Sequence, residues 1–446
     1  MTSEDKGTDF RHPELWDTPD RIRNELAKTM GHIYRHGMTT LSGGNLSVID
    51  GLGNIWITPS GTDKGSMKPD DLVCVAPDGT VEGLHKPSME YPLHREVYKA
   101  RPDIRALIHA HPPVLTSFSI VHRVPDTSVV RSWREICGSA GYAGYETPGS
   151  DGMGKTVASE FMKGHDTVIM ENHAVVAGGK DLAEALARLE ALEYCARTIH
   201  AAGFIGELKI SDEIHEDNSE ILSGYTALQG SGDLQSVLHG AAPGIDEEPL
   251  AEEICGLTVR ACNRGLLYGF SGTVSARSTG NNFLITQDKV LRCYIGKENI
   301  TRADGTGLSL NARMHADIYN RLSSVNAVIT AQPPYLMAFA VTGKEIDVRT
   351  IPESWLLLRE MPLVSVAAVA PENEEIFAKL AAGSPAVLIS NDSVLVTGES
   401  LLQAFDRLEV AEMTARSLIV GQSLGTVKPI SSQDISELRK AFGIAE

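Results

Sequence analysis

The chain has 446 residues, of which 42% are hydrophobic and 22% are charged, and its formal net charge is -18. This length exceeds one ordinary core and predicts about two or three domains, and the composition is typical of a soluble globular protein. An acidic chain lacks the basic face that nucleic-acid binding requires, so we expect no nucleic-acid partner.

The N-terminal segment, residues 1–17, is polar and has no apolar stretch of the kind found in secretory signals. No run elsewhere is long enough to span a bilayer, so no membrane partner is expected. The six cysteines are scattered through apolar segments without a C-x-x-C pair, which is typical of buried free thiols. These features predict a cytoplasmic protein, because disulfides are rare in that compartment.

In chain order, the first half alternates amphipathic helices with short strands rich in Val and Ile. The pattern predicts a sheet flanked by helices, and therefore an α/β fold. The expected helices are 21–35, 91–100 and 182–202, and the expected strands are 55–58, 72–75, 106–111 and 167–170.

The second half repeats the first. The segment ALIHAHPP at 106–113 is echoed by AVITAQPP at 327–334, and LHREVY at 93–98 by MHADIY at 314–319. Because the repeat has the length of a whole domain, it indicates a tandem duplication rather than a solenoid. The segment between the copies is rich in Asp, Glu, Ser and Gly and is typical of a linker. We expect a tail at 1–17, a first domain at 18–208, a linker at 209–249 and a second domain at 250–446.

The first copy carries the residue types of a catalytic metal site. His109 and His111 are two residues apart at the end of a predicted strand, where alternate side chains share a face. Glu90 lies upstream and His173 downstream. Three neutral nitrogen ligands, an open coordination position and a carboxylate base are a recurrent arrangement in metalloenzymes.

Five motifs in order resemble the class II aldolase/adducin family, the group of fuculose-phosphate aldolase and ribulose-phosphate epimerase. They are SGGN at 42–45, TPSG at 58–61, PSME at 87–90, HAH at 109–111 and NH at 172–173. The resemblance implies two tandem α/β/α domains, each with a mainly antiparallel sheet flanked by helices. It also implies that His109, His111 and His173 bind a divalent metal, zinc first, with manganese, cobalt or iron as alternatives. Glu90 would be the catalytic acid/base. Residues implied to hold a substrate phosphate are Asn45, Ser60, Gly61 and Ser88.

Three positions depart from the family pattern or extend it. Met89 stands where aldolases of this family often have a second serine, so the substrate could be unphosphorylated or carry an apolar portion. Arg131 and Arg134 fall where the family presents residues to a neighbouring subunit, and either could hold a substrate carboxylate or phosphate, or form a surface ion pair. His94 is interpreted as structural, because the second copy keeps an equivalent, His315, without the rest of the site.

The second copy lacks the metal-binding residues at the aligned positions. Asn311 replaces the glutamate, and Thr330, Gln332 and Asp392 replace the three histidines. The anion loop is also altered, with Thr273 and Asp288 in place of the asparagine and serine. We therefore expect no catalytic metal there. Because the family usually assembles as a ring of four, two chains would give a homo-oligomer with a pseudo-fourfold arrangement of domains.

These features predict a divalent-metal-dependent carbon–carbon lyase acting on a small molecule. The first expectation is retro-aldol cleavage of a ketose, ketose phosphate or hydroxy-keto acid through an enediolate. The second is decarboxylation of a hydroxy-keto or aromatic acid, and epimerisation and dehydration remain open. A third possibility, from a different class of protein, is an adducin-like scaffold that binds protein partners and catalyses no reaction. The complete histidine set in the first copy argues against it.

Overall fold

The computed structural model describes residues 18–210, 241–280, 282–303, 310–369 and 374–444. Two compact units divide the chain: 1–128 with 132–196, and 129–131 with 197–446. The predicted tail and most of the predicted linker lie outside the described residues. The domain boundaries expected from the sequence therefore stay predictions.

The first unit is built on a mixed sheet whose strand order is β4-β3-β2-β1-β5-β8-β7-β6. Neighbouring strands are antiparallel except for β6 and β7, which are parallel. The strands are β1 (Asn45–Ile49), β2 (Ile55–Ile57), β3 (Val73–Val75), β4 (Val81–Glu82), β5 (Ala106–Ala110), β6 (Gly141–Ala143), β7 (Thr167–Met170) and β8 (Ala174–Gly179). The helices are α1 (Pro19–Arg35), α2 (Tyr91–Ala100), α3 (Pro113–Ile120), α4 (Arg131–Cys137), α5 (Asp151–Met162) and α6 (Leu182–Ala202). All seven elements expected in this half are confirmed, with ends that agree within two residues.

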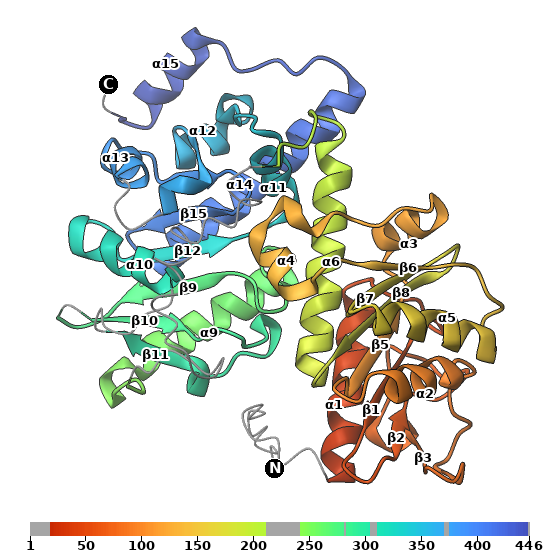
Figure 1. Cartoon of the computed structure of the whole chain (residues 1–446). Coiled ribbons are helices and arrows are strands. Elements are labelled where there is room, and N and C mark those ends of the chain that lie inside the picture. Colours follow the sequence, from red (N-terminus) through yellow and green to blue (C-terminus); the bar gives the residue numbers. More distant parts are fainter. Residues whose placement is uncertain (1–17, 211–240, 281, 304–309, 370–373, 445–446) are drawn as a thin grey trace. The chain divides into compact units, whose positions relative to one another are not determined.

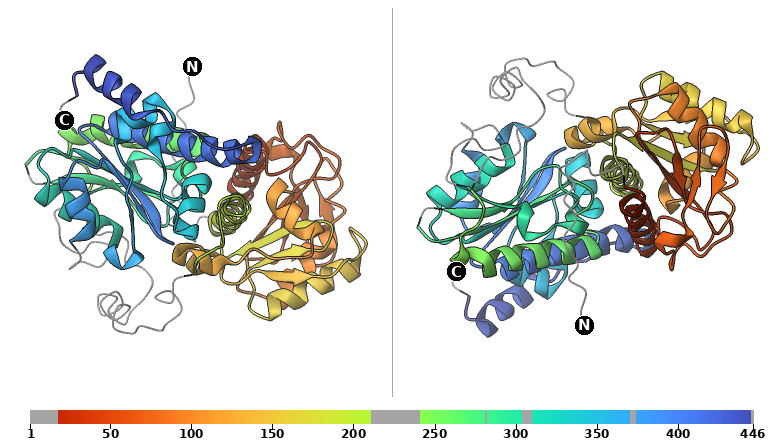
Figure 2. Two further views of the ribbon diagram at one scale, coloured as in Figure 1. Left: turned by 90° about the horizontal axis from the view of Figure 1, so that it is seen from above. Right: turned by 90° about the horizontal axis from the view of Figure 1, so that it is seen from below.

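Helices α2 and α5 pack on one face of this sheet (Figure 1). Their buried side chains, among them Leu93, Val97 and Phe161, meet Leu107 and Val176 from the sheet. The apolar residues of α2 recur at helical spacing, which is why this helix lies with one side against the strands. On α1, the buried His32 Nε2 lies 2.7 Å from Glu190 Oε1 of α6, and the two helices run together in Figure 2.

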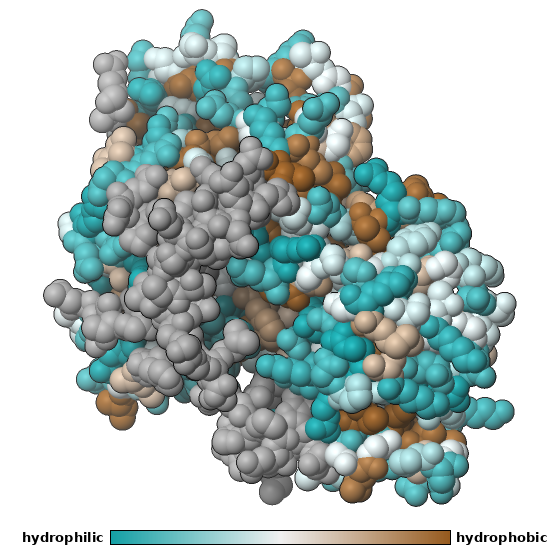
Figure 3. Space-filling view, viewed as in Figure 1, coloured by the Kyte–Doolittle hydropathy of each residue, from teal (hydrophilic) through white to brown (hydrophobic). Residues whose placement is uncertain are grey.

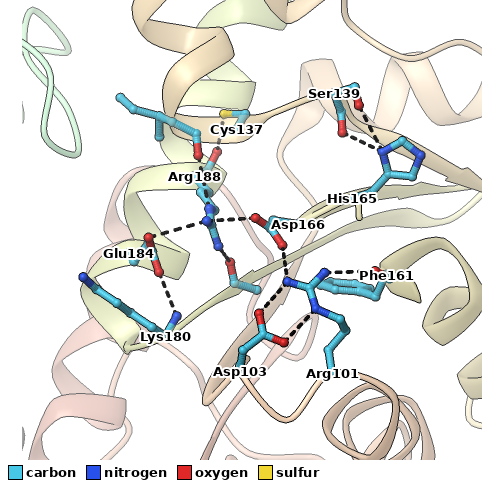
Figure 4. Close-up of polar contacts among 12 residues, drawn as sticks. Arg101, Asp103, Cys137, Ser139, Phe161, His165, Asp166, Lys180, Glu184 and Arg188 are labelled. Carbon is cyan, nitrogen blue, oxygen red and sulfur yellow. Dashed lines mark hydrogen bonds and ion pairs between the residues drawn. The ribbon is translucent and has the colours of Figure 1, made fainter. Parts of the chain in front are cut away.

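A network of ion pairs ties α6 to the strand ends and loops of the first unit (Figure 4). The Arg188 guanidinium donates to the carbonyl oxygens of Ile136 (3.1 Å) and Gly178 (2.6 Å) and lies 2.9 Å from an oxygen of Asp166. Asp166 also accepts a hydrogen bond from Arg101 at 3.1 Å. Arg188 therefore satisfies two backbone carbonyls and one carboxylate at once, while its side chain is only 13% exposed.

We expect Arg188→Met to destabilise the first unit by about 2–4 kcal/mol, because it leaves two carbonyls and part of a carboxylate without their donor. Arg95→Met is the matched control, since Arg95 is 33% exposed and, within the described residues, forms ion pairs with Glu96 and Asp151. That control should cost less than about 1 kcal/mol. Urea unfolding followed by circular dichroism measures both, and equal losses would contradict the assigned role.

The second unit repeats the architecture. Its sheet has the order β11-β10-β9-β12-β15-β14-β13, antiparallel except for the outer pair β13 and β14. The strands are β9 (Thr273–Arg277), β10 (Phe283–Thr286), β11 (Ile300–Ala303), β12 (Ala327–Ala331), β13 (Leu363–Val364), β14 (Ala386–Ile389) and β15 (Ser393–Gly398). The helices are α9 (Glu248–Asn263), α10 (Leu310–Arg321), α11 (Pro334–Thr342), α12 (Pro352–Leu358), α13 (Glu375–Ala381), α14 (Leu401–Leu424) and α15 (Ser432–Ala441).

Strand register confirms the alignment of the two copies at the centre of the sheet. In the first unit Asn45 on β1 is paired with His109 on β5. In the second unit Thr273 on β9 is paired in the same way with Thr330 on β12. The fold is thus α/β with two mainly antiparallel sheets flanked by helices, as the sequence predicts.

The surface seen in Figure 3 is predominantly hydrophilic, with hydrophobic side chains in scattered patches. None of the helices that the structure describes has both the length and the apolar character needed to cross a bilayer. All six cysteines are free thiols, four of them buried and two half-buried.

Candidate metal centre

The end of β5 places two histidines beside each other. His109 is fully buried in the strand, between β1 and β8. His111 follows the last strand residue, and its backbone N–H donates to the carbonyl of Met38 at 3.0 Å. Pro112 and Pro113 come next, end the strand and begin α3, because proline cannot continue a ladder but fits the first turn of a helix. The two imidazole centroids lie 4.8 Å apart.

The third histidine comes from the turn between β7 and β8. Asn172 has a φ of 52°, a left-handed conformation that asparagine tolerates, and His173 N–H donates to the Met170 carbonyl at 3.1 Å. This turn brings the His173 ring to 5.0 Å from His109 and 5.5 Å from His111, between centroids. One ligand nitrogen from each ring lies within 4.8 Å of the other two, and no other such cluster is found among the described residues.

Glu90 stands at the N-cap of α2 and faces the histidines. Its backbone N–H donates to Ser88 Oγ at 3.2 Å, and its carboxylate benefits from the positive end of the helix dipole. The carboxylate oxygen Oε2 lies 3.1 Å from His109 Nε2, and Oε1 lies 3.4 Å from His173 Nε2. The structure therefore brings the four residues together that the sequence singled out for chemistry.

The electrostatics of this cluster suit a cation. Burial would raise the pKa of Glu90, but the charge and hydrogen bond of His109 outweigh it and hold that pKa well below its ordinary value. Burial, followed by the positive charges of His109 and His173, lowers the pKa of His111 to about 3. His111 therefore keeps a free lone pair at neutral pH, which is the form that binds a metal.

The donor set fits a divalent metal ion. His111 Nδ1 is buried, and no hydrogen-bond partner for it is found within the described part of the chain. His109 Nδ1 lies 3.1 Å from the Val175 carbonyl, which orients the ring and directs Nε2 toward the cluster. Imidazole nitrogens beside a carboxylate are ligands that zinc and neighbouring transition metals prefer.

The residues predicted to hold a substrate anion fall into two groups. Asn45 is buried, and both ends of its amide are engaged by other side chains: Nδ2 donates to Glu90 Oε2 at 2.7 Å, and Oδ1 accepts from His94 Nε2. The TPSG and PSME loops lie side by side, because Pro59 and Pro87 form a β-bridge and Ser60 N–H donates to the Lys86 carbonyl at 3.0 Å.

The remaining predicted positions differ in exposure. Ser88 is buried, Gly61 is exposed with a φ of 69°, and Met89 is 76% exposed. Arg131 and Arg134 lie on α4, where Arg131 is half-buried and Arg134 exposed. Substrate contacts by these residues stay predictions.

The conformation and the surroundings of the backbone require glycine at the second glycine position of the SGGN motif, Gly44. Gly44 has a φ of 68°, and a Cβ built there would lie 2.7 Å from the carbonyl oxygen of His109. Only glycine meets both conditions without a shift of the strand that carries His109.

Two buried side chains of the first unit were not singled out for chemistry from the sequence. Lys64 is buried, donates to the Pro59 carbonyl at 2.8 Å, and has its pKa lowered to about 8 by burial. The internal repeat could have drawn attention to Lys64, because a cationic residue, Arg292, stands at the corresponding position of the second unit. Arg292 donates to the Gln287 carbonyl at 2.7 Å. His94, which the sequence marks as structural, contacts Asn45 as well as the scaffold.

In the second unit, Gln332 stands at the position of His111 and is held by hydrogen bonds of its own. Gln332 Oε1 accepts from Ser271 Oγ at 2.7 Å, and Gln332 Nε2 donates to the Asp392 carbonyl at 2.5 Å. Thr330 is buried at the strand position of His109.

A family model described as the class II aldolase and adducin N-terminal domain matches residues 24–200 and again residues 252–419. The chain therefore belongs to the class II aldolase and adducin family. Together with the three-histidine cluster, this makes it a class II, metal-dependent aldolase-like enzyme.

Three relatives show the range of activities among similar proteins. The chain is 32% identical over 199 residues to 5-deoxy-D-ribulose 1-phosphate aldolase of Bacillus thuringiensis serovar kurstaki. This alignment covers 44% of this chain and 92% of that protein. It is 29% identical over 186 residues to 3-oxo-tetronate 4-phosphate decarboxylase of Escherichia coli, covering 41% and 87%. It is 32% identical over 176 residues to L-fuculose phosphate aldolase of Methanocaldococcus jannaschii, covering 39% and 93%.

Proposed function

We propose that the first unit cleaves a carbon–carbon bond next to a carbonyl in a ketose, a ketose phosphate or a hydroxy-keto acid. The observation that carries this proposal is the cluster of three histidine nitrogens within 4.8 Å of one another, with the Glu90 carboxylate against two of the rings. When bound, a divalent metal supplies positive charge that stabilises the negative charge developing on the substrate oxygens.

The other catalytic and binding roles are assigned to side chains of this chain. His109, His111 and His173 hold the metal, and zinc suits them first, with manganese, cobalt or iron as alternatives. Glu90 moves a proton at the substrate carbon or hydroxyl, since its carboxylate faces the histidine cluster. The paired loops carrying Ser60 and Ser88 offer donors to an anionic group.

Decarboxylation of a hydroxy-keto acid is the second candidate. It is favoured by the similarity to the 3-oxo-tetronate 4-phosphate decarboxylase of Escherichia coli, a protein that matches about as well as the two aldolases. Both reactions place negative charge on the same substrate oxygens, so one metal centre suits either.

We propose that the second unit binds no catalytic metal. Thr330 and Gln332 occupy the places of His109 and His111, and Gln332 is held by its own hydrogen bonds. Its proposed role is to complete a homo-oligomer in which active and inactive copies alternate around a pseudo-fourfold axis.

A substrate screen tests the proposal. Full-length protein reconstituted with zinc or manganese is assayed against phosphorylated ketoses, free ketoses and hydroxy-keto acids, with aldehyde and CO₂ release measured separately. We expect about one tightly bound ion per chain and aldehyde release from at least one class. Release of CO₂ alone would favour decarboxylation. Less than about one ion per two chains, with no turnover, would contradict both and favour a scaffold.

A further inference from the structure

A chain of buried hydrogen bonds runs from the core to the carboxylate of Glu90. Tyr98 OH lies 2.7 Å from Ser47 Oγ, and Ser47 Oγ lies 2.6 Å from His94 Nδ1. His94 Nε2 contacts Asn45 Oδ1, and Asn45 Nδ2 donates to Glu90 Oε2 at 2.7 Å. His94 and Ser47 are fully buried and Asn45 is 3% exposed, so water does not compete for these contacts.

The chemistry of Glu90 determines the direction of every bond in this chain. An ionised carboxylate can only accept, so Asn45 must turn its NH₂ group toward Glu90 and its oxygen toward His94. His94 must then carry its proton on Nε2 in order to donate to that oxygen. Burial, together with the positive charge of His109, lowers the pKa of His94 to about 3, so the ring is neutral and has one N–H. Nδ1 therefore accepts from Ser47, which in turn accepts from Tyr98.

The second unit contains only the Tyr–Ser–His part of this chain. Ser275 Oγ lies 2.7 Å from His315 Nδ1 and 2.7 Å from Tyr319 OH, as in the first unit. His315 Nε2 is buried and has no hydrogen-bond partner within the described residues, because Thr273 stands where the first unit has Asn45. The Ser–His–Tyr part therefore serves the scaffold in both copies, whereas the link from His94 to Asn45 occurs only beside the acidic residue.

We propose that His94 is a positioning residue that fixes the Asn45 amide and, through it, holds the Glu90 carboxylate in place for proton transfer. This rests on the proposed function of Glu90 as the acid/base. A rotation of the Asn45 amide would set its oxygen against the carboxylate, and the His94 N–H prevents that rotation. The link fixes Oε2, and so leaves Oε1 as the oxygen that receives or delivers the proton.

Steady-state kinetics of the metal-loaded full chain test this role. His94→Leu removes the donor, and we expect kcat to fall by about 10–100-fold, the range for partners that orient a metal centre, while KM is unchanged. His94→Gln keeps a donor near the Nε2 position and should restore much of kcat. His315→Leu is the matched control, because it breaks the same scaffold bonds in the second unit and should leave kcat unchanged.

A double variant separates positioning from simple destabilisation. If His94 acts through Asn45, the variant Asn45→Ala/His94→Leu should be no slower than Asn45→Ala alone. Multiplied losses of kcat in the double variant would overturn the proposal. It would also be overturned if His94→Gln were as slow as His94→Leu, or if His315→Leu lowered kcat equally.

A measurement that does not depend on turnover distinguishes failure of this proposal from failure of the proposed function. In histidine-¹⁵N-labelled protein, two-bond ¹H–¹⁵N correlation spectra report which ring nitrogen carries the proton, and His94 is assigned by its absence in His94→Gln. We expect a proton on Nε2 in the wild type and loss of that single tautomer in Asn45→Leu. A proton on Nδ1 in the wild type would overturn the proposal. If no substrate is turned over but the Nε2 proton is found, the function fails and the positioning of Glu90 stands.

Discussion

Glu90→Gln should lower kcat by about 10²–10⁴-fold while metal content stays unchanged. Glutamine keeps the size of the side chain, and its oxygen can still accept from Asn45 Nδ2, so the local geometry survives. What is lost is the ability to take up a proton. Metal content measured by atomic emission, together with single-turnover rates at saturating substrate, tests both parts of the expectation.

The control for this variant is Glu96→Gln, on the same helix. Glu96 pairs with Arg95 and Lys99 rather than with the histidines. It should therefore retain the wild-type kcat. Full activity in Glu90→Gln would refute the role of Glu90 as the acid/base, and loss of metal from that variant would mean that the carboxylate is needed as a ligand.

His111→Ala should abolish both metal binding and turnover. Loss of a partner that merely orients a ligand costs about 10–100-fold in metal affinity or activity, and loss of a ligand itself should cost more. His111 suits this test because its Nδ1 has no hydrogen-bond partner in the described part of the chain, so few other contacts are removed with it. Competition with a chelator measures the change in affinity.

Gln332→Met is the matched variant in the second unit, at the position that corresponds to His111. It should leave metal content and kcat unchanged if that unit binds no metal. Thermal unfolding of both variants controls for loss of the fold. Retention of a tightly bound ion in His111→Ala would contradict the three-histidine site, and loss of an ion in Gln332→Met would contradict the assignment of a single centre per chain.

The secondary structure of the first unit could be predicted because its signals are local. Helix α2 begins and ends where the sequence predicts, at Tyr91 and Ala100, because its apolar residues follow helical spacing and Pro92 fits the first turn. Strand β5 was expected to include His111 but ends at Ala110, where the two prolines that follow interrupt the ladder.

The role predicted for Asn45 shows the limit of what a short sequence motif can predict. Its place in the SGGN motif implies a substrate phosphate contact, yet in the structure its amide joins Glu90 to His94. The contact partner depends on the register of β1 against β5 and on the packing of α2 across both strands. Neither is encoded in the spacing of residues along one segment.

The sequence by itself determined the residue types of the site, the duplication and the loss of histidines from the second copy. These follow from order and identity along the chain. Only the tertiary structure decided that rings from β5 and from the β7–β8 turn converge with a carboxylate at the start of α2. The physical reason is that periodicity assigns a side chain to a face of its element, whereas strand register and helix packing decide which side chain of another element it meets. For the same reason, the sequence showed that both copies have a histidine at this position, His94 and His315. Only the structure showed that His94 is linked to the Glu90 carboxylate through Asn45.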